Sequence, residues 1–299
     1  MLLLAISAAL MALAAKQPGF AEWYSENVYS LFVNSLGRLW GLFPFSVSEM
    51  ALYILAAVFL LSLAAAVRKG IHGAVPWLSC ILLAAGILAF LYTICCRINY
   101  HRKSFSEEEG IITYRYTAQD LKEVCLWLTE EVNTISGEVD RDSSGVMTLE
   151  APEGEGAVEA NYNGDMTPYN IPFTACHELS HLRGFMEERE ANFIAFLACI
   201  GSERADFRYS GYLSGWTYCM NVLYRADQEA WRTTRALLDE RAEADVSANS
   251  EFWDSYEGII SETADRVNDT YLRVNGQADG VQSYDRMVDL IVAYFGDRA

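Results

Sequence analysis

Three runs of apolar residues without charge occupy the first third of the chain. They cover residues 1–15, 50–67 and 74–96, and Arg68 and Arg97 close the last two. A membrane helix needs about 20 consecutive apolar residues, so the second and third runs have spanning length and the first is short for a span. Ser46 and Glu49 form a capping-box pattern that begins the second helix. We predict a multi-pass anchor with about three transmembrane helices.

Beyond residue 103 the apolar positions recur at helical spacing. Leu121, Val124, Cys125, Leu128 and Val132 follow this period after a Thr117 cap, and further helices are predicted at 209–224, 227–242, 251–274 and 284–295. Residues 136–168 are polar and contain glycine, which predicts an irregular connection with a short strand near 156–162. The fold class is therefore mainly α, with a membrane anchor at 1–103 and a second domain at 104–299.

Charge changes at the same boundary. Residues 1–103 hold seven of the 22 Lys and Arg and three of the 40 Asp and Glu, which leaves the remainder strongly acidic. Phosphate binding needs clustered Lys and Arg, and Lys122 is the only lysine after Lys103. We therefore exclude nucleic acid as a partner. The acidic surface favours solubility over the capture of cationic peptides.

The strongest chemical signal is the sequence His177-Glu178-Leu179-Ser180-His181. Residues four apart share a helix face, so two imidazoles can bind one metal ion while Glu178 reaches a metal-bound water as general base. Pro172, Phe173 and Leu179 are apolar and predict a buried helix, in which unpaired imidazoles would be costly. This pattern favours a zinc site over two hydrogen-bonded core histidines.

The third ligand is expected just downstream. Catalytic zinc takes three protein ligands and one water, and these two histidines are the only ones after residue 103. Glu188 and Asn192 are four apart, which favours Glu188 as ligand and Asn192 as a partner that orients the site. Glu187 fits the HExxHxxGxxH spacing, and Glu190 is the third choice. Mn, Fe and Co also suit two histidines and one carboxylate.

Resemblance favours Glu188 among these acids. Glu188-x-x-Ala191-Asn192 resembles the E-x-x-A-N element that follows HExxH in gluzincin-like peptidases. This resemblance implies that Glu188 completes the metal site of His177 and His181, with Glu178 as catalytic base. The segment between the two elements is unusually short.

Several separate blocks resemble the bacterial family called domain of unknown function 3810. The blocks are Pro44-Phe45-Ser46 with Glu49, Asn99-Tyr100-His101-Arg102, Thr174-Ala175-Cys176-His177-Glu178, Glu188 with Glu190-Ala191-Asn192-Phe193, and Gly280-Val281 with Ser283-Tyr284 and Arg286-Met287-Val288-Asp289. The resemblance implies a membrane anchor and a zincin-like, mostly helical metallopeptidase domain with the ligands and base named above. Tyr284, in the last block, would either stabilise an oxyanion or help to seat the last helix.

The location of the domain is predicted from the same family. Its members have a basic N-terminus and a basic loop between the second and third spans, which implies an extracytoplasmic domain. This chain lacks the basic start and has only Arg68 and Lys69 in that loop, and its Lys and Arg count alone favours a cytoplasmic domain. We expect a cell-membrane protein with an extracytoplasmic domain.

The predicted function is a membrane-anchored zinc metallopeptidase whose partners are the lipid bilayer and a peptide or protein substrate. One alternative is a non-catalytic metal-binding membrane sensor or scaffold protein. Another is a peptidase dedicated to a single regulatory partner. A transporter is disfavoured, because none of the three runs carries an acidic or basic residue.

Overall fold

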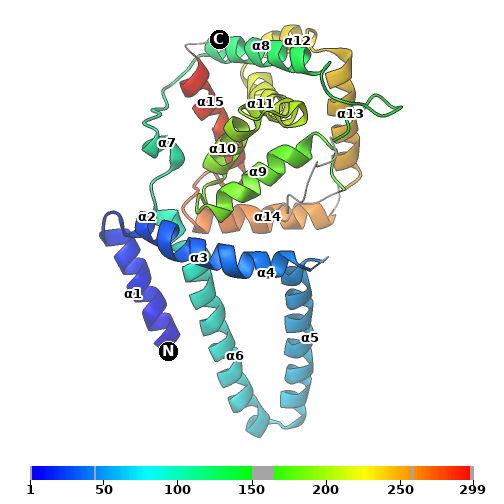
Figure 1. The fold of residues 1–299 in the computed structure, drawn as a ribbon. Helices are drawn as coiled ribbons and strands as arrows, with labels where there is room; N and C mark the ends of the chain where they lie inside the picture. The colour runs from blue at the N-terminus through cyan, green and yellow to red at the C-terminus, as the bar shows by residue number, and fades with distance from the viewer. Residues whose placement is uncertain (1, 44, 150–164, 257–258, 297–299) are drawn as a thin grey trace. The chain divides into compact units, whose positions relative to one another are not determined.

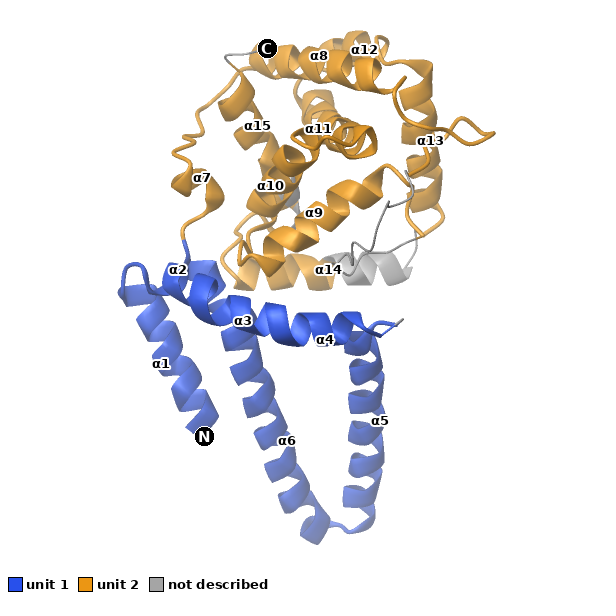
Figure 2. Ribbon diagram, viewed as in Figure 1, with its two compact units in different colours: residues 1–102 blue, residues 103–299 orange. Residues whose placement is uncertain are grey.

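The computed structural model describes residues 2–43, 45–149, 165–256 and 259–296. Helices dominate these ranges, and their only β-type pairing is the isolated bridge between Arg141 and Met147. The prediction of a mainly α fold is therefore confirmed. The chain separates into two compact units, residues 1–102 (unit 1) and 103–299 (unit 2), which Figure 2 colours separately.

Unit 1 contains a helical hairpin made of α5 (Val47–Arg68) and α6 (Ile71–Tyr92), seen in Figure 1. Ser46 caps α5 by accepting a hydrogen bond of 3.3 Å from the Glu49 amide. The turn of the hairpin is tight, because a Cβ on Gly73 would lie 2.6 Å from the Ala66 carbonyl oxygen. Farther along, Trp77 Nε1 donates to Ser62 Oγ at 3.0 Å and joins the two helices.

Two helices of unit 1 are long and apolar enough to cross a membrane. They are α5 and the apolar helix that begins with α6 at Ile71. Their apolar side chains are largely exposed, as Leu61 illustrates at 72%. Apolar surface on this scale indicates contact with a membrane. The first run forms the shorter helix α1 (Leu2–Lys16), which packs on α6, so a third span stays a prediction.

A continuous helical run links α1 to α5. It comprises α2 (Phe20–Tyr24), α3 (Ser30–Phe32) and α4 (Arg38–Gly41), with π-helical turns at Ser25–Tyr29 and Val33–Gly37. Its first part is fixed by a 2.8 Å hydrogen bond from the Tyr24 hydroxyl to the Ile94 carbonyl. The later part exposes Leu39 and Trp40.

Unit 2 is a bundle of helices around α11. Its helices are α7 (Phe105–Glu108), α8 (Ala118–Ile135), α9 (Asn170–Leu182), α10 (Glu188–Ile200), α11 (Ala205–Ala226), α12 (Gln228–Arg235), α13 (Glu240–Asp254), α14 (Ile259–Val274) and α15 (Met287–Phe295), with a 3₁₀ segment at Gly280–Arg286. In Figure 1, α11 lies among the others, and it packs on α8, α9, α10 and α15. The apolar core of unit 2 is formed where these helices meet.

Two glycines let α10 and α11 approach closely. A Cβ on Gly211 would lie 2.6 Å from Cys199 Cβ, and a Cβ on Gly215 would lie 2.6 Å from Phe196 Cε2. On another face of α11, Trp216 Nε1 donates to Thr129 Oγ1 of α8 at 2.8 Å. These contacts fix the position of α10, the helix that carries Glu188.

The predicted helix boundaries are confirmed in some places and wrong in others. The helix after Thr117 is present as α8, and α14 ends at Val274, before Gly276 with its φ of 94°. The single helix predicted at 227–242 is wrong, because the chain turns after α12 and Asp239 caps a new helix, α13. The helix predicted at 251–274 is likewise divided, since α13 ends at Asp254 and α14 begins at Ile259.

A buried carboxylate fixes part of the irregular connection after α8. Asp245 is fully buried, and its Oδ2 accepts hydrogen bonds from Arg141 at 2.8 Å and from the Tyr209 hydroxyl at 2.5 Å. Its Oδ1 accepts another from the Met147 amide at 2.8 Å. The connection is thereby attached to α11 and α13. The strand predicted near 156–162 lies outside the described residues.

Candidate metal centre

The HExxH segment forms the C-terminal part of α9. Pro172 lies in the first turn of this helix, where its missing N–H breaks no helical hydrogen bond. Gly184 follows the helix with a φ of 90°, a conformation that favours glycine, and the chain turns so that α10 packs against α9. As the four-residue spacing predicts, His177 and His181 meet on one face, with their Nε2 atoms 3.1 Å apart.

Hydrogen bonds hold both imidazoles in one orientation. His177 Nδ1 lies 2.7 Å from Asn192 Oδ1, and His181 Nδ1 lies 2.7 Å from the Phe185 carbonyl oxygen. Both partners are acceptors, so each Nδ1 carries the proton and donates. In the neutral rings each Nε2 then presents a lone pair, which is the form that binds a metal ion.

Glu188 completes a converging group of ligand atoms. Its Oε2 lies 3.2 Å from His177 Nε2 and 3.7 Å from His181 Nε2. Glu188 is 8% exposed, and no hydrogen-bond donor reaches Oε2 within the described ranges. Zinc with bonds of about 2.1 Å in a tetrahedron separates its ligand atoms by about 3.4 Å, close to the distances found here. The donor set fits a zinc ion.

The electrostatics of the group also favour a positive charge between these atoms. Burial raises the pKa of Glu188, but attraction to the adjacent His177 and His181 imidazoles in their protonated form outweighs it and lowers the pKa to about 2. Burial lowers the pKa of His181, but the adjacent Glu188 carboxylate outweighs it and raises that pKa. A proton or a metal ion can supply this charge, and three converging acceptors from two helices suit a metal ion.

The other two candidate acids lie elsewhere. Glu187 is the N-cap residue of α10, and its carboxylate pairs with Arg189 Nε at 3.1 Å with both side chains 40% exposed. Glu190 is 1% exposed and accepts from the Ser106 amide at 2.9 Å and from Ser106 Oγ at 2.8 Å. Among the three acids, only Glu188 faces the histidines.

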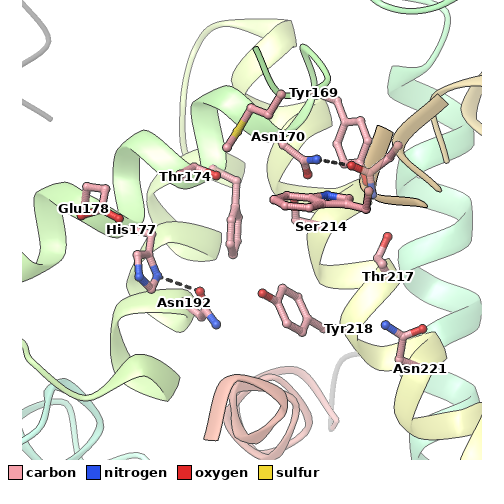
Figure 3. A pocket seen from close by; sticks show the side chains of 14 residues that line it. Tyr169, Asn170, Thr174, His177, Glu178, Asn192, Ser214, Thr217, Tyr218 and Asn221 are labelled. Atoms are coloured by element: carbon pink, nitrogen blue, oxygen red, sulfur yellow. Dashed lines mark hydrogen bonds between the residues drawn. The ribbon is translucent and has the colours of Figure 1, made fainter. Parts of the chain in front are cut away.

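A cavity of about 490 Å³ adjoins the metal centre. Its lining is Met166, Tyr169, Asn170, Phe173, Thr174, His177, Glu178, Asn192, Ser214, Thr217, Tyr218, Asn221, Asn249 and Trp253. Figure 3 shows His177 and Glu178 together at one end of it. The residue predicted as general base therefore lines this cavity.

The residues of α11 in this cavity were missed by the sequence analysis. Ser214, Thr217, Tyr218 and Asn221 line the cavity, and the Tyr218 hydroxyl points into it towards the His177 end in Figure 3. Their spacing of three and four residues places these polar side chains in one stripe along the helix, which could have indicated them. The side chain of Tyr284, the tyrosine considered from the sequence, lies outside the described part of the structure.

Comparison with known proteins identifies the family. A family model described as a protein of unknown function (DUF3810) matches residues 24–156 and 156–292. No curated protein and no solved structure matches the chain. The matched ranges include both apolar helices of unit 1 and all the residues of the candidate metal centre. The chain belongs to the DUF3810 family of proteins of unknown function.

Proposed function

We propose that this protein is a membrane-anchored zinc metallopeptidase that hydrolyses peptide bonds with an activated water. One observation carries the proposal. Three metal-ligand atoms, His177 Nε2, His181 Nε2 and Glu188 Oε2, converge within 4.8 Å of one another beside a cavity that Glu178 also lines. The HExxH motif lies on α9, and Glu188 lies on the next helix, α10. This order supports a zincin-like domain of the gluzincin type.

His177, His181 and Glu188 would hold the zinc ion, and Asn192 and the Phe185 carbonyl would keep the two imidazoles in the ligand orientation. When bound, zinc supplies a lowered pKa for its water ligand and a positive charge that polarises the scissile carbonyl.

The remaining steps belong to side chains at the end of the cavity. Glu178 follows His177 directly and would accept the proton of the attacking water, then pass it to the leaving amine. Tyr218 points its hydroxyl into the cavity from α11 and would donate a hydrogen bond to the carbonyl oxygen as negative charge develops there.

We also propose that unit 1 anchors the protein in the cell membrane. We propose that α5 and α6 cross the bilayer and that α1 contributes a further span, so that lipid and a peptide or protein substrate are the partners. The exposed apolar surface of these helices supports this arrangement. An extracytoplasmic unit 2 rests on the family's charge pattern, and cleavage of a C-terminal tag by protease added to intact cells would test it.

Metal content of the purified full chain in detergent tests the ligand set. We expect about one zinc per chain, strong loss in His181→Ala and Glu188→Ala, and parental content in the matched control Glu187→Ala. Absence of bound zinc after zinc is supplied would overturn the proposal. Loss in Glu187→Ala with retention in Glu188→Ala would show that the third ligand is misassigned.

Glu178→Gln separates the peptidase from a metal-binding sensor or scaffold. This change keeps the size of the side chain and removes the proton acceptor, so we expect full zinc content and loss of peptide hydrolysis. A parent that binds zinc but cleaves no peptide in a proteome-derived library would contradict general peptidase activity. Cleavage of one co-purifying membrane protein, abolished by Glu178→Gln, would then indicate a dedicated partner.

A further inference from the structure

The cavity beside the candidate metal centre has an uncharged lining away from that centre. Among the described lining residues, those of a type that can carry charge are His177 and Glu178, and both lie at one end of the cavity. The rest of the lining consists of aromatic rings, Met166, and the amides and hydroxyls of Asn170, Thr174, Asn192, Ser214, Thr217, Tyr218, Asn221 and Asn249. This contrasts with the net charge of −18 of the whole chain.

One of these hydroxyls is buried without a partner. Ser214 is 5% exposed, and its Oγ forms no hydrogen bond with any described atom. Thr217, on the same helix, donates to the Leu213 carbonyl at 2.8 Å, four residues back, as helical hydroxyls commonly do. A buried hydroxyl left unpaired is costly, so the position of Ser214 in the cavity lining points to a hydrogen-bonding ligand.

Polar side chains where the start of α9 meets α13 hold one another in place. Asn170 Nδ2 donates to Asn249 Oδ1 at 2.5 Å and to Thr167 Oγ1 at 2.9 Å, and Thr167 Oγ1 donates to Asn249 Oδ1 at 3.0 Å. These bonds join the start of α9 to α13. Side chains that are ordered before binding lose less conformational entropy on binding, so this part of the cavity is suited to specific recognition.

We propose that this cavity binds an uncharged polar segment of the substrate, with Ser, Thr, Asn or Gln beside the scissile bond. This inference rests on the proposed peptidase function and names its substrate class. A cavity of about 490 Å³ has room for more than one side chain. Lys, Arg, Asp and Glu are excluded, because each would lose hydration there, and the two charged residue types of the described lining, His177 and Glu178, lie at the end beside the metal centre.

Digestion of a proteome-derived peptide library by the zinc-loaded full chain in detergent tests the inference. We expect charged residues to be depleted more than about tenfold, and uncharged polar residues to be enriched, in at least one position next to the cleaved bond. Cleavage sites with Lys, Arg, Asp or Glu at library frequency in every flanking position would overturn the inference and leave the peptidase function standing.

A charge placed in the cavity gives a second readout. Asn221 is exposed and lines the cavity from α11, so Asn221→Asp adds a carboxylate with little risk to folding. We expect Asn221→Asp to raise the acceptance of Lys and Arg up to about fivefold, with no such change in the uncharged control Asn221→Gln. Equal profiles for the two variants would contradict our placement of the substrate.

Affinity selection keeps the two proposals distinguishable. The same library is applied to the immobilised Glu178→Gln full chain, which is expected to bind without cleaving. Enrichment of peptides rich in Ser, Thr, Asn and Gln would support the inference even if the parent cleaves no peptide. Absence of cleavage by the parent would overturn only the peptidase function. Enrichment of charged peptides, or of none, would overturn the inference.

Discussion

Replacement of Asn192 by alanine tests how the chain prepares His177 for a metal ion. Asn192 is 2% exposed, and its Oδ1 lies 2.7 Å from His177 Nδ1. Without this acceptor, the ring proton is no longer held on Nδ1 and can occupy Nε2, the atom 3.2 Å from Glu188 Oε2. That proton must then leave before a metal ion can bind.

Asn192→Ala is expected to lose only part of the zinc affinity, because only one ligand, His177, is affected. His181 keeps its 2.7 Å bond to the Phe185 carbonyl, a backbone group that the substitution leaves in place. Loss of a hydrogen-bond partner behind a ligating histidine typically weakens metal binding about 10–100-fold. This corresponds to about 1.4–2.7 kcal/mol. Removal of a ligand itself, as in Glu188→Ala, should cost far more.

Competition with a chromophoric zinc chelator measures this effect on the full chain in detergent. Asn192→Asp is the matched control, because it retains an acceptor for Nδ1 and should bind zinc at least as tightly as the parent. Thermal unfolding followed by circular dichroism checks that both variants fold. Parental affinity in Asn192→Ala, or equal weakening in both variants, would refute the reasoning.

Three further predictions concern the helices around the centre. Asp245→Ala should lower the free energy of unfolding of unit 2 by about 3–5 kcal/mol, because it leaves buried donors unpaired, whereas Glu243→Ala at a half-exposed ion pair should cost less than about 1 kcal/mol. Denaturant unfolding measures both, and equal losses would contradict the burial argument. Gly215→Ala should cost about 1–3 kcal/mol in the same assay, because its Cβ would lie 2.6 Å from Phe196 Cε2, and an unchanged midpoint would refute the close approach. Tyr218→Phe should lower kcat by about 10²–10³-fold with zinc content and KM near parental values, and a change confined to KM would assign the hydroxyl to substrate binding instead.

Local spacing predicted the part of the candidate site that lies on one helix. His177 and His181 share a face because α9 is regular, so the four-residue interval sufficed. The same argument could not choose among Glu187, Glu188 and Glu190, because that choice depends on the turn at Gly184 and on the packing of α10. In the structure Glu187 pairs with its neighbour Arg189, whereas Glu190 accepts a hydrogen bond from Ser106, which is 84 residues away in the sequence.

The far side of the cavity was beyond prediction from local patterns. Asn170, Ser214 and Asn249 come from three helices that are distant in sequence, and only folding brings them together. The division of the predicted helix 227–242 has a similar cause. The Asp239 amide donates to Asn133 Oδ1 of α8 at 2.7 Å, so a contact with another helix fixes the turn before α13.

The pairing of Glu190 with Ser106 sets a limit on how much of the chain can be removed. Both Ser106 donors reach a carboxylate that is 1% exposed, two residues beyond Glu188 in the first turn of α10. A truncated protein that starts at the first long helix of unit 2, at Ala118, would bury this carboxylate without those donors, at a cost of about 1–3 kcal/mol or more. Ser104 caps α7 through the Glu107 amide at 3.3 Å. A soluble fragment intended for crystallisation or assay should therefore begin before Ser104.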